Sequence, residues 1–149
     1  MAYSLLKLVH ILFAITAVGS NITYGVWQGL AGNSPEHEAF VLRGIKFLDN
    51  RVANPAYGLL LVTGLIMAFW HWSLTTHWIV AAIILYVVLI GVAVAFYSPA
   101  LTEQIRSVER DGHNSSAYQA ASRRAALIGA GLFLPVLAIL FMMVVKPAL

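Results

Sequence analysis

Four long apolar stretches dominate the sequence and limit what the chain can fold into. They cover about residues 3–27, 55–72, 77–97 and 125–145. A helix needs roughly 20 apolar residues to cross the hydrocarbon core of a bilayer. Inside lipid, every backbone N–H and C=O has to be paired within the segment itself. The sequence therefore predicts an all-α membrane protein, with a four transmembrane helix bundle as one domain over residues 1–149.

The composition supports a membrane protein and excludes several classes of site. Hydrophobic residues make up 60% of the chain and charged residues 10%, whereas soluble domains carry about 25% charged residues. Cysteine is absent, which excludes disulfides, thiolate metal sites and cysteine nucleophiles. The basic residues are scattered through short loops and do not form a nucleic-acid site. The partner that composition predicts is the lipid bilayer.

The polar stretch between the first two spans predicts an amphipathic helix. Ser34-Pro35-Glu36 is typical of a helix start, with serine as the cap and proline in the first turn. Apolar and polar side chains then separate onto two arcs over residues 35–50. We expect an interfacial helix that lies on the membrane surface or covers one end of the bundle. A plain connector is the alternative. Asn54-Pro55 should begin the second span, and Ser98-Pro99 should end the third.

The distribution of basic residues predicts the orientation in the membrane. Loops that remain in the cytoplasm carry an excess of Lys and Arg. Segments 28–54 and 98–124 hold Arg43, Lys46, Arg51, Arg106, Arg110, Arg123 and Arg124, whereas the other side holds Lys7 and Lys146. Both termini should therefore lie outside, and the two long loops should be cytoplasmic. Trp70, Trp72 and Trp78 predict an aromatic belt at the outer membrane boundary.

His10 is the leading candidate for chemistry. Helical spacing places it on one stripe of the first span with small and polar residues, and large apolar residues cover the rest. An ionisable residue within a span is a candidate functional residue, and imidazole is a common haem ligand in membrane bundles. The alternative is a neutral histidine bonded to a neighbouring carbonyl. The spans contain no Asp or Glu, which argues against a carrier with a carboxylate relay.

A haem iron bound by His10 would have a second axial position, and the sequence offers several candidates for it. His71 would reach the same outer side, and it shares a face with Gly64, where the missing side chain would admit a flat ring. Met67 and Met142 are alternatives, while His77 better fits the start of a helix. The alternative for His71 is an interfacial histidine among tryptophans. The predicted metal ligands are thus His10 and His71.

A second polar group is expected toward the inner leaflet. Asn21, Tyr24 and Gln28 of the first span should lie near Arg51 and Tyr57 at the start of the second. Such a set can bind an acidic propionate or a lipid head group, which makes Tyr57 and Arg51 candidate cofactor-binding residues. Hydrogen bonding between helices is the alternative for this set.

Three segments carry a resemblance to known families: MAYSLLKLVHILFAI at residues 1–15, LDNRVANPAYGLLLVTGLIMAFW at 48–70, and HWIVAAIILYVV at 77–88. They resemble a bacterial family of predicted integral membrane proteins of unknown function. More distantly, the chain is similar to the four-helix bacterial protoporphyrinogen IX oxidase family. The resemblance implies that His10 matches a histidine thought to serve haem binding. Where that oxidase family has a functional lysine, this chain has Ala82, which weakens the case for oxidase activity.

The leading hypothesis is therefore a small protein of the bacterial inner membrane that binds haem b through His10. It would act as a redox or haem-handling component, alone, as a homo-oligomer, or as a subunit of a larger membrane complex. A non-catalytic accessory subunit is the alternative from another class, and an oxidase-like enzyme is a third. We expect no enzyme activity of the chain on its own, and an oxidoreductase if there is any.

Overall fold

The computed structural model describes residues 1–147, and these residues form four long helices with no strand. The first is α1 (Ala2–Ala31). The second joins α2 (Glu38–Leu48), the π-helical turn η1 (Asp49–Ala53) and α3 (Asn54–His71). The third joins α4 (His77–Val92), the π-helical turn η2 (Ala93–Tyr97) and α5 (Ser98–Asp111). The fourth is α6 (Ser116–Val145).

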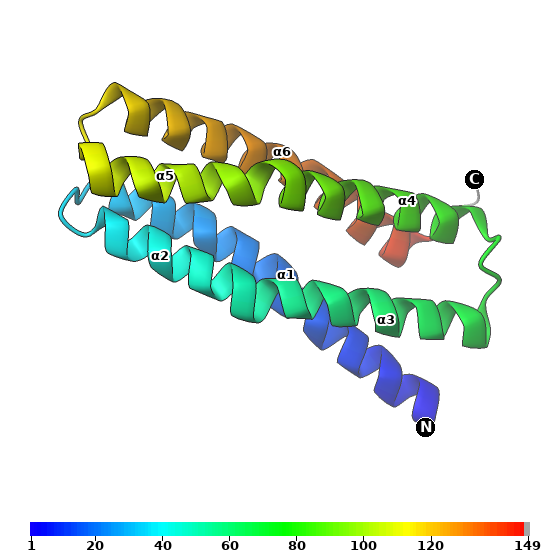
Figure 1. The fold of residues 1–149 in the computed structure, drawn as a ribbon. Coiled ribbons are helices and arrows are strands. Elements are labelled where there is room, and N and C mark those ends of the chain that lie inside the picture. Colours follow the sequence, from blue (N-terminus) through cyan, green and yellow to red (C-terminus); the bar gives the residue numbers. More distant parts are fainter. Residues whose placement is uncertain (148–149) are drawn as a thin grey trace.

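The four long helices run antiparallel to their neighbours as an up-and-down bundle (Figure 1). Residues 32–37 and 112–115 lie together at one end, which we call the loop end. Met1, the last turn of α6 and residues 72–76 lie at the other, which we call the turn end. α1 packs on α3 and α4 packs on α6, while α2 packs against α1 and α5. Each long helix is long and apolar enough to cross a membrane, so the predicted four-span bundle is confirmed.

The helices are longer than a bilayer requires. They contain 30, 34, 35 and 30 residues, which corresponds to about 45–52 Å at 1.5 Å per residue. The hydrocarbon core is about 30 Å thick. Since α2, η1, α5 and the start of α6 carry seven of the nine Lys and Arg residues, we expect the excess length to project beyond the membrane at the loop end.

The helix predicted at residues 35–50 is present, but it is not a separate element. A single turn over residues 35–37 precedes it, and α2 begins at Glu38. It then continues through η1 into α3, so Asn54-Pro55 lies inside a continuous helix. Ser98-Pro99 likewise lies inside the third helix. The helix boundaries predicted at these two prolines were wrong.

The two π-helical turns explain how both prolines are accommodated. Proline lacks an N–H, and its ring clashes with the carbonyl four residues earlier in an α-helix. Each proline follows directly on a π turn, in which the hydrogen bonds span five residues. The Asn54 N–H donates to the Asp49 carbonyl, and the Ser98 N–H donates to the Ala93 carbonyl. The wider turn before each proline lets the helix continue.

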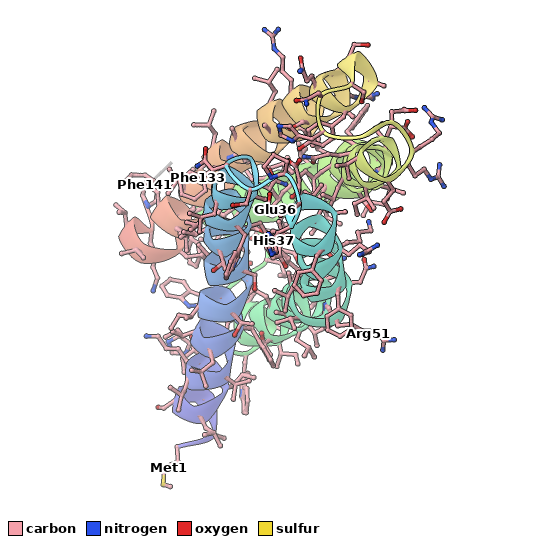
Figure 2. All side chains as sticks on the ribbon, turned by 90° about the vertical axis from the view of Figure 1, so that its left-hand side faces the viewer. Met1, Glu36, His37, Arg51, Phe133 and Phe141 are labelled. Carbon is pink, nitrogen blue, oxygen red and sulfur yellow. The ribbon has the colours of Figure 1, made fainter. Side chains whose placement is uncertain are left out.

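The loop end has a core like that of a soluble helix bundle. Leu42, Ile45 and Leu101 are at most 2% exposed and pack with Tyr24 and Tyr118. Elsewhere in the bundle, fewer side chains are buried between the helices. Many large apolar side chains lie on its surface, as they do in helices that face lipid. In Figure 2, for example, Phe133 and Phe141 lie on the outside of α6. α2 therefore forms one side of this core at the loop end.

The aromatic belt predicted at the turn end is partly a packing cluster. Trp72 and Trp78 meet edge to face with their ring centroids 5.3 Å apart. The Lys146 ammonium lies 4.8 Å from the centroid of Trp72. Trp70 is exposed as expected, but Trp78 is only 8% exposed and packs against Ala68. Trp78 therefore fills the space between helices.

Candidate functional site

The His10 side chain lies between α1 and α3, where it contacts Thr63 and Gly64. His10 Nδ1 is 2.9 Å from Thr63 Oγ1. A Cβ atom built on Gly64 would lie 3.1 Å from His10 Cε1. His10 is half-buried and Thr63 is buried. We call these three residues the histidine site.

The hydrogen bonds of Thr63 determine which imidazole nitrogen carries the proton. Thr63 Oγ1 lies 2.7 Å from the Leu59 carbonyl oxygen and 3.2 Å from that of Leu60. A carbonyl only accepts, so the Thr63 hydroxyl donates its one proton there. Its lone pair then accepts from His10, which must carry its proton on Nδ1. In the neutral imidazole, Nε2 is then unprotonated.

The Nε2 atom of His10 is unpaired within residues 1–147 and is not fully enclosed. No residue within 1–147 donates a hydrogen bond to Nε2, and this atom is not among the enclosed unpaired polar atoms of that range. An imidazole that binds a metal typically donates its other N–H to an oxygen, which fixes the ring and its tautomer. His10 has this arrangement without any rearrangement of the chain.

Gly64 does provide space for a flat ring, but the ring is that of His10. The 3.1 Å approach means that the imidazole already covers the glycine. The space at Gly64, predicted to admit a flat ring on the face shared with His71, is therefore filled by the His10 imidazole. The absence of a Cβ serves the close approach of α1 to α3.

The structure does not bring His71 to His10. His71 lies against Tyr3, with ring centroids 4.9 Å apart, and against Trp72 at 5.8 Å. Because α1 and α3 are antiparallel, this contact lies two turns from the histidine site, about 10 Å at 1.5 Å per residue. The imidazoles of His10 and His71 therefore do not lie on opposite faces of one flat ligand. Met67 is half-buried and lies one turn beyond Gly64 on α3, nearer to His10 than His71 is.

The second predicted polar group forms interhelical hydrogen bonds. Asn21 Nδ2 donates to Tyr57 Oη at 2.5 Å, and Tyr86 Oη donates to the Tyr57 carbonyl at 2.6 Å. These bonds join α1, α3 and α4. Arg51 is exposed in η1 and points away from the helices (Figure 2). It therefore lies apart from both Tyr57 and the histidine site.

Sequence reasoning missed a buried carboxylate at the loop end. Glu38, 2% exposed at the start of α2, accepts from the Tyr118 hydroxyl and pairs with His113 Nδ1. Its neighbours Glu36 and His37 are exposed in the connection before α2, as the view from this end shows (Figure 2). A glutamate in a polar segment gave no signal of burial. The i, i+4 and i, i+7 spacing of Glu38 from the buried positions Leu42 and Ile45 was the one available hint.

The histidine site would supply a single protein ligand. Within residues 1–147, no group of three or more His, Cys, Asp or Glu side chains is placed to hold a metal ion. Imidazole binds iron firmly when other donors complete the coordination, as the four porphyrin nitrogens do in haem. His10 fits such an axial ligand, whereas His71 and Arg51 do not fit the same group.

Comparison with known proteins yields one match. The model of a family described as "Predicted integral membrane protein (DUF2269)" matches residues 4–147. This range covers the four long helices, apart from the first two residues of α1, and every residue of the histidine site. No curated protein and no solved structure gives a significant match.

Proposed function

The chain belongs to this family of predicted integral membrane proteins, and on that premise we propose that it binds haem b through His10. The observation that carries the proposal is the contact of His10 Nδ1 with Thr63 Oγ1, from which we infer that Nδ1 donates and Nε2 is free. We further propose that it serves as a redox or haem-handling component of a bacterial inner membrane, with both termini outside. The seven basic residues of the loop end support this orientation.

In this proposal the chain supplies one axial ligand and holds it still. Thr63 fixes the ring from α3, and Gly64 lets the ring lie against that helix. Bound haem would supply one-electron chemistry at its iron. His71 is left out because it stacks on Tyr3 two turns away. Met67 is the remaining candidate from this chain for the other axial position.

The test is a haem titration of the detergent-purified chain, followed by absorbance. We expect the wild type to shift the Soret band of added haem to that of a histidine complex, and His10→Ala to lose the shift. His71→Ala is the matched control, and it should bind like the wild type. A wild type that gives no shift, or a His10→Ala variant that binds equally well, would contradict the proposal.

An accessory subunit without a cofactor is the second candidate, and one observation favours it. Gly25 and Gly29 are exposed on α1 four residues apart, and a Cβ on either would meet open space. Glycines at this spacing allow another transmembrane helix to approach closely. Size measurement in mild detergent tests this role. A stable complex that Gly25→Leu disrupts would support it, and a monomer under all mild conditions would count against it.

Oxidation of porphyrinogens has less support. The position that carries a lysine in the similar oxidase family is Ala82 here, and this side chain is 1% exposed within α4. A direct oxidation assay of the purified chain should therefore give no activity above that of free haem.

A further inference from the structure

A groove follows the surface where the third long helix meets α6. Its first part is apolar, has a volume of about 830 Å³, and is bordered by α4 and η2 on one side and α6 on the other. Its second part is a hollow of about 790 Å³ between α5 and α6, which we call the polar hollow because charged and hydroxyl side chains join the alanines of its lining. Ala120 and Arg124 line both parts. The two parts therefore form one feature that changes from apolar to polar toward the loop end.

Small residues of α6 create this groove. Gly131 lines the apolar part, and a Cβ placed on it would meet no atom within 4 Å. Ala117, Ala120 and Ala121 line the polar hollow, where longer side chains would fill the space between α5 and α6. The groove therefore exists because one face of α6 carries small side chains.

Positive charge collects at the polar end of the groove. Arg106 of α5 and Arg124 of α6 both line the hollow, and Arg123 lines the apolar part beside it. All three are exposed, and none forms an ion pair with a residue of 1–147. Glu103 is the one acidic residue lining the hollow. The charge at this end is therefore net positive and unneutralised.

We propose that this groove binds one anionic phospholipid, with its phosphate between Arg106 and Arg124 and an acyl chain along the apolar part. Guanidinium groups pair with phosphate through two parallel hydrogen bonds. Basic pockets between transmembrane helices are suited to acidic lipid head groups. Ser98 and Thr102 also line this hollow, but their hydroxyls are engaged within the protein, with Lys46 Nζ and with the Ser98 carbonyl.

The length of the apolar part favours a lipid over a free anion. From Arg124 to Pro135, both of which line the groove, α6 rises about 16 Å at 1.5 Å per residue. This is the length of an extended acyl chain within one leaflet, whose thickness is about 15 Å. A soluble phosphate would use only the arginine end and leave the apolar part without a function.

The test compares lipid classes on the intact chain. The protein is reconstituted in nanodiscs with equal amounts of phosphatidylglycerol and phosphatidylcholine and then released for native mass spectrometry. We expect phosphatidylglycerol to exceed phosphatidylcholine among the retained lipids by about tenfold, because two arginines near a head group each strengthen binding severalfold. The double variant Arg106→Gln/Arg124→Gln should retain the two lipids about equally.

Two further variants separate charge, shape and folding. Arg43→Gln/Arg51→Gln removes the same charge from exposed positions outside the groove, and it should keep the wild-type preference. Gly131→Leu should lower retention of both lipids, because the new side chain occupies the apolar part. Equal retention of both lipids by the wild type would overturn the proposal. So would a preference that neither groove variant changes, a preference equally lost in the Arg43/Arg51 control, or a self-associated protein in which a second copy covers the groove.

Discussion

His10 and Gly64 lie in direct contact across the α1–α3 interface, where a Cβ on the glycine would come within 3.1 Å of the imidazole. Such a distance is shorter than ordinary van der Waals contact between carbon atoms, about 3.5–4.0 Å. The imidazole cannot retreat freely, because Thr63 holds its Nδ1 at 2.9 Å. The absence of a side chain at Gly64 therefore determines where the imidazole of His10, the proposed haem ligand, can lie.

This contact predicts that Gly64→Ala disturbs the histidine site. Alanine favours a helix over glycine, but its methyl group would press on the imidazole, and overpacking costs about 1–3 kcal/mol. Gly58→Ala is the matched control, because a Cβ there meets open space on the same helix. We expect Gly64→Ala to be less stable than Gly58→Ala by about 1–2 kcal/mol, as measured by unfolding in detergent. Equal stability of the two variants would show that the ring moves away without cost.

A second prediction concerns Thr63, which positions His10 without binding iron itself. Thr63→Val keeps the shape of the side chain but removes the oxygen that accepts from Nδ1–H. Loss of such a partner typically lowers metal affinity about 10–100-fold. Haem titration should show this weakening at unchanged helix content, and Thr63→Ser should restore most of the affinity. If the valine variant binds as tightly as the wild type, the tautomer assignment is wrong.

A third prediction concerns the buried carboxylate of Glu38. Glu38→Gln keeps the volume but replaces one acceptor oxygen with an amide donor, opposite the Tyr118 hydroxyl and His113. A buried polar group left without its partner costs about 1–3 kcal/mol. We expect that loss in the free energy of unfolding, with faster hydrogen exchange in α2. Glu36→Gln, at an exposed site two residues away, should change stability by less than about 0.5 kcal/mol. Equal effects of both variants would assign the loss to charge alone.

A fourth prediction concerns orientation, and the chain suits the experiment because it contains no cysteine. Single cysteines at Ser34 and Ser73 would report the loop end and the turn end separately. Because basic segments remain in the cytoplasm, a membrane-impermeant maleimide added to spheroplasts should label Ser73→Cys. Ser34→Cys should react only after permeabilisation. The reverse pattern would invert the proposed topology.

Much of the fold follows from local patterns in the sequence. Four apolar stretches predict four long helices, and helical spacing places His10 on an inward stripe with Asn21, which does reach Tyr57. The helix boundaries predicted at the two prolines were wrong, because a proline breaks a helix or not depending on the turn before it. Pro55 and Pro99 would normally mark helix ends, but η1 and η2 remove the clash. Nothing in a single sequence marks a π turn.

The site was less predictable, because it depends on which turn of one helix faces which turn of another. The sequence places Gly64 and His71 on one face of α3, but the α1–α3 pairing decides that His10 meets Gly64 and Tyr3 meets His71. Glu38 was missed for the same reason. Its burial depends on the approach of α6 and the 112–115 connection, which bring Tyr118 and His113 to it.

The π turn η1 also sets the rotational phase of everything that follows it. Each residue turns an α-helix by about 100°, and a π turn holds one residue more than the α-helical turn it replaces. If the same residues were wound as a regular α-helix, the extra residue would rotate Thr63 and Gly64 by about 100° relative to α2. Deleting one residue within Asp49–Ala53 would instead remove the π turn and keep Thr63 and Gly64 in phase. The rotation of α3 relative to α2, and with it the face that α3 turns toward α1, therefore depends on the π geometry of a segment that does not contact the imidazole.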